Sequence, residues 1–152
     1  MNYLNNQSVP RGIRNNNPGN IVRTSAGWQG KIPFSQSQDN HFEQFTEMKY
    51  GVRALMKDVY NAIKGGKNTA KVLISAYAPA FENNTSAYID TVSSLIGIGV
   101  TELLDLSQET IVGIAKAIIY VENGSAGSHY VTDADYTNAL AILGIPLKKK
   151  VK

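Results

Sequence analysis

From residue 52 onward, apolar side chains recur every three or four positions, and each run ends at a glycine or a proline. The first run consists of Val52, Leu55, Met56, Val59, Tyr60 and Ile63. It stops at Gly65-Gly66, as expected for the apolar face of a helix that ends at glycine. A chain dominated by such runs is expected to pack helix against helix around one core.

The same spacing predicts four more helices. The second helix is expected from Thr69 to Pro79, and the third from Asn84 or Thr85 to Gly97. The fourth is expected from Ser107 to Asn123-Gly124, and the fifth from Thr132 to Gly144. Thr132 and Asp135 have the spacing of a capping box, in which each side chain bonds to the backbone of the other residue. We therefore expect a helical body of five helices.

The segment before these helices has a different pattern. Residues 11–45 contain the short runs "NIVR", "GWQGKIPF" and "HFEQF", separated by Gly, Ser, Asn and Gln. They predict a small β-wing of two or three strands, so the expected fold class is mainly α (α+β). We expect residues 1–10 to be a flexible lead-in, residues 11–146 to form a single domain, and residues 147–152 to be a basic tail.

The composition argues against several kinds of chemistry. The 152 residues include no cysteine, and the two histidines, His41 and His129, lie far apart. Disulfides, thiol catalysis and a zinc site are therefore not expected, and neither is a cofactor. No segment approaches the ~18 unbroken apolar residues of a membrane span, and "MNYLNNQSVP" lacks the features of a signal peptide.

The positive charge belongs to the end of the chain. The formal charge is +3, but the last five residues, "KKKVK", carry four lysines, so the rest of the chain has a charge of −1. A short basic tail is able to touch DNA or an anionic cell wall without specificity. The simpler interpretation is a solubilising, disordered terminus, and specific nucleic-acid binding is not expected.

Glu122 breaks the apolar pattern of the helix predicted from Ser107. The apolar face of this helix consists of Ile111, Ile114, Ala115, Ile118 and Ile119, and Glu122 occupies the next position on that face. Partial burial and the negative end of the helix dipole both favour the protonated acid, which is the form that a general acid needs. The alternative is that Glu122 turns to solvent or pairs with Arg11, Arg14 or Arg23.

Other candidates for a site are less distinctive. Glu82 precedes a helix N-terminus, where a negative charge is favourable without any catalytic role. Asp39 and Glu43 lie on the predicted wing and face either a cleft or water. Tyr77 and Tyr88 have helical spacing, which is as typical of a core as of a site.

Several motifs together carry a family resemblance. "NPGNIVRTSAGWQGKIP", "FEQFTEMKYGVRALMKDV" and "YAPAFENNTSAYIDTV" resemble the glucosaminidase-type branch of the lysozyme superfamily. More closely, the pattern over residues 11–124 is similar to phage virion and endolysin-like proteins assigned to peptidoglycan cleavage. The resemblance implies a lysozyme-like helical domain in which a β-wing flanks a cleft.

The order of the motifs departs from that branch. There, a catalytic Glu on a helix precedes the Asn-rich turn, whereas here nothing upstream of Arg11 is acidic. The best match to that helix is "AIIYVENG", which suggests a circular permutation in which the Glu122 helix packs beside the Asn-rich segment. The resemblance thus assigns the catalytic acid to Glu122, with Glu82 and Glu43 as further candidates.

The Asn-rich segment "RGIRNNNPGNI" then becomes one wall of a cleft. Pro18 and Gly19 hold its turn, and its asparagines offer amides suited to sugar hydroxyls and N-acetyl groups. Arg14 or Arg23 is able to reach peptide carboxylates. The substrate-binding residues implied by the resemblance are Asn15, Asn17, Asn20, Arg14, Trp28, Tyr77 and Tyr88. Alternatively, the asparagines only satisfy the backbone of their own loop.

The expected function is cleavage of the β-1,4 bond between N-acetylmuramic acid and N-acetylglucosamine. A lytic transglycosylase needs one carboxylate, whereas a muramidase that activates water needs a second acid. The alternatives are a catalytically silent virion or peptidoglycan-binding protein and, less favoured, DNA binding through the tail. The expected partners are glycan strands and other virion proteins, and the expected setting is a phage particle or the host periplasm and cell wall.

Overall fold

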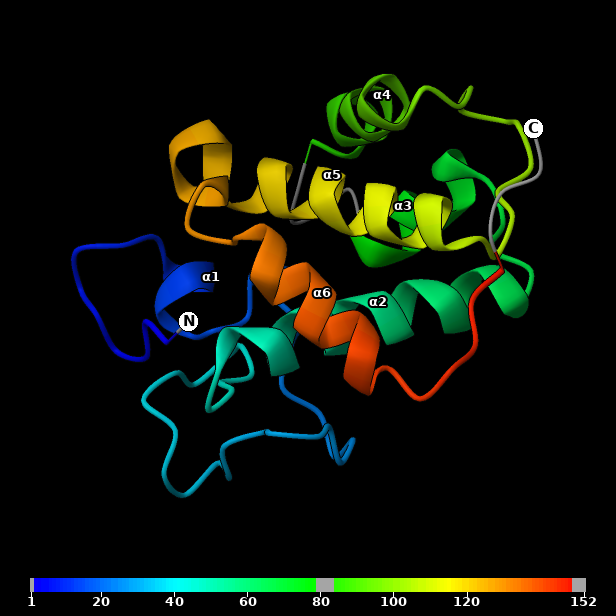
Figure 1. Ribbon diagram of the computed structural model, residues 1–152. Coiled ribbons are helices and arrows are strands. Elements are labelled where there is room, and N and C mark those ends of the chain that lie inside the picture. Colours follow the sequence, from blue (N-terminus) through cyan, green and yellow to red (C-terminus); the bar gives the residue numbers. More distant parts are fainter. Residues whose placement is uncertain (1, 79–83, 149–152) are drawn as a thin grey trace.

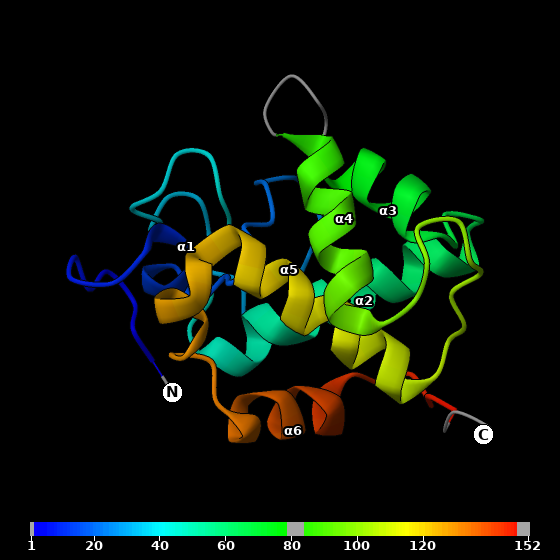
Figure 2. The same cartoon turned by 90° about the horizontal axis from the view of Figure 1, so that it is seen from above.

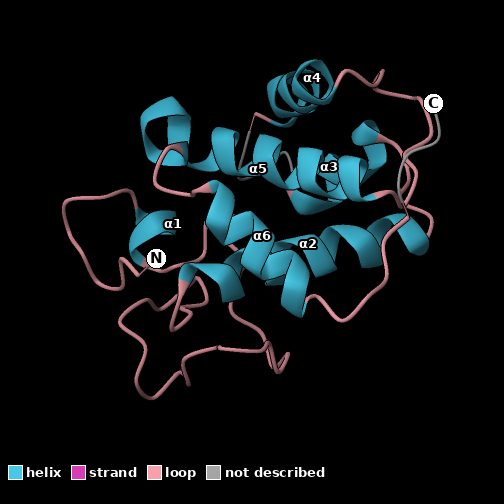
Figure 3. Cartoon of the chain, viewed as in Figure 1, coloured by secondary structure: helices cyan, strands magenta, loops and turns pink. Residues whose placement is uncertain are grey.

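The protein is mainly helical in the computed structural model, which describes residues 2–78 and 84–148 (Figures 1 and 3). The helices of these residues are α1 (Arg11–Arg14), α2 (Met48–Lys64), α3 (Ala70–Tyr77), α4 (Thr85–Ile96), α5 (Gln108–Ser128) and α6 (Asp133–Ile142). The five helices predicted from apolar spacing are thereby confirmed. The single turn α1 was not predicted, because four residues are too short to show a helical period.

Polar side chains begin four of these helices where the sequence indicated. Thr69, Asn84 and Ser107 each accept a hydrogen bond from a backbone N–H three residues later, at the starts of α3, α4 and α5. Thr132 and Asp135 form the reciprocal capping box at the start of α6. These caps satisfy backbone donors that the first turn of a helix leaves without partners.

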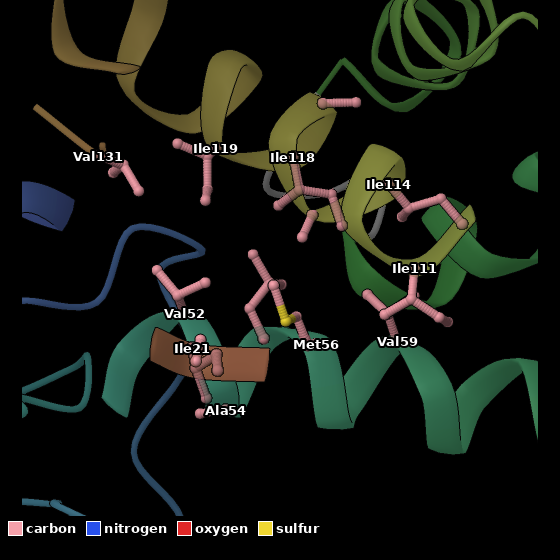
Figure 4. Packing of buried hydrophobic residues seen from close by; sticks show 14 of the residues in the cluster. Ile21, Val52, Ala54, Met56, Val59, Ile111, Ile114, Ile118, Ile119 and Val131 are labelled. Carbon is pink, nitrogen blue, oxygen red and sulfur yellow. The ribbon is translucent and has the colours of Figure 1, made fainter. Parts of the chain in front are cut away.

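The core lies mainly between α2 and α5. Figure 4 shows Val52, Met56 and Val59 of α2 facing Ile111, Ile114, Ile118 and Ile119 of α5, and all of these side chains are buried. Helix α6 packs on α2, and α4 packs on the opposite side of α5, next to α3 (Figures 1 and 2). Helix α5 is therefore central, and its position decides where Glu122 lies.

The predicted β-wing is a loop rather than a set of strands. Within the part of the chain that the structure describes, this region has two isolated antiparallel bridges, Val22 with Phe42 and Lys31 with Phe45, and no extended strand (Figure 3). Gly, Pro and Ser interrupt each short run before a ladder of hydrogen bonds can extend. The buried Phe45 side chain anchors the loop to the helical core.

Residues 2–10, which composition predicts to be a flexible lead-in, bond to the Asn-rich segment in the structure. The backbone N–H of Tyr3 donates to Asn16 Oδ1 at 3.0 Å, and that of Asn5 donates to the carbonyl of Arg14 at 2.7 Å. Val9 is buried in the core. The backbone of this segment is thus joined to the Asn-rich segment, which composition alone does not reveal. At the other end of the chain, residues 149–152 of the expected basic tail lie outside the described residues.

Candidate functional site

Glu122 lies in the last regular turn of α5. Gly124 has φ 75° and ψ 173°, so the helix breaks there before one further turn runs to Ser128. A side chain other than glycine is strained at this positive φ, which explains why the break falls at Gly124. The helix end expected at Asn123-Gly124 is thus present as a kink, with a turn added beyond it.

Two hydrogen-bond donors hold the carboxylate of Glu122. Asn20 donates its side-chain amide to Oε1 at 2.8 Å, and Tyr88 of α4 donates its hydroxyl to Oε2 at 2.9 Å. Neither partner is one of the arginines named as alternatives. Both donors come from other parts of the chain, and neither was predicted as a partner of Glu122 from the sequence.

The Asn-rich segment packs directly against the end of α5. Asn123 donates its side-chain amide to the carbonyl of Pro18 at 2.7 Å. Gly12 of α1 lies so close that an added Cβ would be 2.5 Å from Asn123 Oδ1 and 3.0 Å from Asn20 Oδ1. The expected packing of the Glu122 helix beside the Asn-rich segment is therefore observed.

Glu122 also lines an open pocket between α4 and α5. The pocket has a volume of about 390 Å³, and its lining residues are Asn84, Ala87, Tyr88, Thr91, Val121 and Glu122. Glu122 is partly exposed, so it is accessible to a molecule in this pocket. Among the described residues that line the pocket, it is the one carboxylate. Asn84 and Thr91 were not candidates from the sequence, where Asn84 signalled only a helix start.

Two tyrosines next to Glu122 remain neutral over a wide pH range. Burial and the neighbouring Glu122 charge raise the pKa of the Tyr88 hydroxyl far above its usual value. Burial also raises the pKa of Tyr77, with further contributions from Glu122 and Asp58. Tyr77 donates its hydroxyl to the carbonyl of Gly19. Both tyrosines therefore act as neutral hydrogen-bond donors, Tyr88 in the pocket and Tyr77 beneath the Asn-rich segment.

Asn15 and Asn17 do not face the pocket, contrary to their expected role in binding substrate. Both are buried. Asn15 donates to Asp39 at 2.9 Å, and Asn17 donates to the carbonyls of Ile21 and Glu43, each at 3.0 Å. For these two residues the alternative interpretation applies, because their side-chain amides form hydrogen bonds within their own loop.

Glu43 and Asp39 are also placed by the structure within the loop. Glu43 is buried and forms an ion pair with Lys31 at 3.1 Å. Asp39 accepts two hydrogen bonds from Arg11, at 2.7 and 2.9 Å. Neither lines the pocket that contains Glu122. Glu82, the remaining acidic candidate, lies outside the described residues.

The other expected binding residues are dispersed. Arg14 lines a separate polar pocket of about 210 Å³, together with Arg11, Asp39 and neighbouring amide side chains. Trp28 packs partly buried against the core, and its buried Nε1 has no hydrogen-bond partner. Of the expected binding residues, the structure brings Asn20 and Tyr88 into contact with Glu122, and Tyr77 supports the segment that carries Asn20.

Two further properties concern the described residues as a whole. No helix among them is both long enough and apolar enough to cross a membrane. No group of three or more histidine, cysteine or acidic side chains in that part of the chain is arranged to hold a metal ion.

The sequence relationship is to a bacteriophage protein. No protein-family model matches the chain. The chain is 36% identical to Protein P5 of Pseudoalteromonas phage PM2 over 119 residues, which cover 76% of this chain and 72% of that protein. The chain therefore belongs to the family of phage proteins that includes Protein P5.

Proposed function

We propose that the protein is a lysozyme-like enzyme that cleaves the β-1,4 bond between N-acetylmuramic acid and N-acetylglucosamine in bacterial peptidoglycan. The observation that carries the proposal is the position of Glu122, a carboxyl group at the edge of an open pocket with its two oxygens held by Asn20 and Tyr88. Such positioning is what general acid–base catalysis requires of a carboxyl group.

The arrangement favours the lytic transglycosylase reaction over hydrolysis. Protonated Glu122 donates its proton to the glycosidic oxygen as the bond to C1 breaks. The carboxylate then accepts the proton of the 6-hydroxyl of the same muramic acid, whose oxygen bonds to C1 and closes a 1,6-anhydro ring. One carboxyl group serves both steps, in keeping with the single carboxylate among the described residues of the pocket.

The Tyr88 hydroxyl suits both protonation states of Glu122. It donates to Oε2 of the carboxylate, and a hydroxyl is equally able to accept a hydrogen bond from a protonated carboxyl group. Asn20 has a different role, because its amide holds Oε1 and links the acid to the Asn-rich segment. The pair therefore fixes the orientation of the acid while its proton leaves and returns.

The family relationship supports a setting in a phage particle or in lysis of the host. Protein P5 is a phage protein, and peptidoglycan is a barrier that a phage meets at both entry and exit. A catalytically silent virion protein that retains the groove is the competing proposal, and the same relationship supports it.

Analysis of peptidoglycan fragments distinguishes these proposals. Purified peptidoglycan is incubated with the wild type, with Glu122→Gln, and with Glu47→Gln as a matched control at an exposed acid outside the pocket. The proposal expects 1,6-anhydro ends by mass spectrometry from the wild type and the control, and none from Glu122→Gln. Reducing ends would indicate a hydrolase with a second acid, for which Glu82 remains a candidate. Full activity in Glu122→Gln would reject Glu122 as the acid, and no products from any of the three proteins would support the silent protein.

A further inference from the structure

A second pocket lies where residues 2–10, α1 and the loop at the predicted β-wing meet, and these three parts of the chain lie next to one another in Figures 1 and 2. Its volume is about 210 Å³, and all of its described lining residues are polar or charged. It shares none of them with the pocket that contains Glu122. We call it the amide pocket, and it is lined by Asn5, Gln7, Arg11, Arg14, Asn15, Gln38, Asp39, Asn40 and Gln44.

The carboxylate of the amide pocket is already fully bonded within the protein. Oδ1 of the buried Asp39 accepts hydrogen bonds from Arg11 at 2.9 Å and from the backbone N–H groups of His41 and Phe42 at 2.9 and 2.8 Å. Its Oδ2 accepts from Arg11 at 2.7 Å and from Asn15 at 2.9 Å. A carboxylate has room for about four such bonds, so Asp39 has no acceptor capacity left for a ligand.

The side-chain oxygens of the neighbouring amides are also bonded. Gln44 donates its Nε2 to Oδ1 of Asn5 at 2.8 Å and to Oδ1 of Asn15 at 2.9 Å. Its Oε1 accepts the backbone N–H of Gln38 at 3.1 Å. By contrast, Nδ2 of Asn5 donates to no residue in the described part of the chain. The ordered side chains of the pocket therefore offer hydrogen-bond donors to a ligand rather than acceptors.

Arg14 supplies a positive charge that has no counterion in the pocket. The charges of Arg11 and Asp39 cancel in their ion pair. The guanidinium of the partly buried Arg14 has one hydrogen bond within the described chain, a long one of 3.5 Å to the carbonyl of Val9, and no carboxylate there lies within ion-pair distance of it. Two cations and one anion line the pocket, so its net charge is +1. Free donors and a single net positive charge together favour a monoanion.

A carboxylate matches the amide pocket better than a phosphate does. A guanidinium binds either group through two parallel N–H bonds, but a phosphate monoester carries about two negative charges at neutral pH. The pocket is also larger than a carboxylate alone requires. The exposed amides of Gln7, Gln38 and Asn40 line the rest of it, and a side-chain amide both donates and accepts, as the amide groups of a peptide do.

We propose that the amide pocket binds a free carboxylate of the short peptides in peptidoglycan, with Arg14 as the residue that binds the anion. Naming peptidoglycan as the source rests on the proposed function, whereas the charge and the free donors of the pocket do not. Because the pocket is separate from the one at Glu122, binding there holds the protein on the cell wall whether or not a glycosidic bond is cleaved.

A titration of the full-length protein tests the proposal. Its amide signals are followed by NMR as acetyl-D-alanyl-D-alanine is added and, in parallel, as the neutral C-terminal amide of the same dipeptide is added. The acid should bind and shift the signals of Asn5, Asn15 and Gln44. The neutral peptide should bind about ten- to a hundredfold more weakly, because it lacks the charge-assisted hydrogen bonds. Equal affinity for the two peptides, or shifts confined to the pocket at Glu122, would overturn the proposal.

Variants of two arginines locate the anion site. Arg14→Gln should bind the acid about ten- to a hundredfold more weakly, and Arg14→Lys should be intermediate because lysine keeps the charge but not the planar fork. Arg23→Gln is the matched control. Arg23 is also partly buried and donates to the carbonyl of Asp39 at 3.1 Å, yet it does not line the pocket. Circular dichroism checks that each variant is folded. Equal losses in Arg14→Gln and Arg23→Gln would contradict a specific site.

Three further titrations separate the source of the carboxylate from the catalytic proposal. Tighter binding of acetyl-L-alanyl-L-alanine would indicate the C-terminus of a protein, and tighter binding of inorganic phosphate would indicate a general anion site; either result rejects a peptidoglycan peptide as the ligand. Glu122→Gln should bind the D-peptide as the wild type does. Binding without release of fragments would leave this proposal standing and reject the enzyme, whereas fragment release without peptide binding would reject only this proposal.

Discussion

Tyr88 and Glu122 meet through a hydrogen bond of 2.9 Å that joins α4 to the end of α5. The tyrosine is buried except at the pocket, and the acid is partly exposed there. Asn20 approaches the same carboxylate from a segment 102 residues away in the sequence. A single carboxyl group therefore connects the two helices and the Asn-rich segment.

Tyr88→Phe should separate the role of the hydroxyl from that of the ring. The phenylalanine ring still fills the buried site, but Oε2 of Glu122 loses the hydrogen bond from the Tyr88 hydroxyl. We expect a modest loss of about 1 kcal/mol in the free energy of unfolding. Fragment release from peptidoglycan should fall by about ten- to a hundredfold, as for loss of a group that supports a general acid. Unchanged release would show that Tyr88 only packs.

Gly51→Ala should disturb the close contact between α2 and the Asn-rich segment. An added Cβ would lie 1.8 Å from the carbonyl oxygen of Asn16, so the backbone has to move. We expect the free energy of unfolding to fall by about 3 kcal/mol in urea denaturation. Gly113→Ala is the matched control, because its Cβ would be 3.7 Å from the nearest heavy atom, on Ile96. That variant should instead be about 0.5–1 kcal/mol more stable, since alanine favours a helix over glycine.

Glu43→Gln should reduce stability without changing the chemistry at the pocket. Glu43 and Lys31 form a largely buried ion pair, and the substitution leaves the lysine without its anion. Loss of one partner of such a pair costs about 3–5 kcal/mol. Urea denaturation measures the loss, and activity per folded molecule should equal that of the wild type. A large loss of activity in fully folded Glu43→Gln would return Glu43 to the catalytic candidates.

Protonation of Asp39 should lower the free energy of unfolding in acid. Burial alone would raise its pKa, but hydrogen bonds from Arg11, the backbone of Phe42 and His41, and Asn15 together hold the pKa well below its usual range. The unfolded chain therefore takes up a proton near pH ~3.9, before the folded protein does. The stability contributed by Asp39 is full above that pH and is lost as the pH falls toward the folded pKa.

Unfolding measured between neutral pH and about pH 3 checks this linkage. The wild type should lose stability more steeply below pH ~4 than Asp39→Asn, which has no carboxylate to titrate at this position. Asn15→Ala provides a milder test, because it removes one donor to Asp39 and leaves the Arg11 pair in place. Parallel curves for the wild type and Asp39→Asn would show that other groups control acid unfolding.

Local signals in the sequence were sufficient for the helical body. Apolar spacing and cap residues such as Thr69, Ser107 and Thr132 act within one or two turns, so a helix and its start are encoded close to where they form. The same reasoning singled out Glu122, because a carboxylate on an apolar face departs from a local pattern. The predicted strands failed since the runs between residues 20 and 46 are too short and too often interrupted, so that only isolated bridges form.

Tertiary structure decided what each polar side chain contacts. The sequence does not distinguish Asn17, whose amide is consumed by its own loop, from Asn20, whose amide reaches Glu122. It also does not reveal that Lys148 lies beside the start of α5, where its carbonyl accepts a hydrogen bond from the backbone N–H of Gln108. These contacts join residues tens of positions apart and depend on how α2, α4 and α5 pack. The sequence by itself therefore determined the helices and one unusual acid, whereas only the packing of the helices decided that acid's partners.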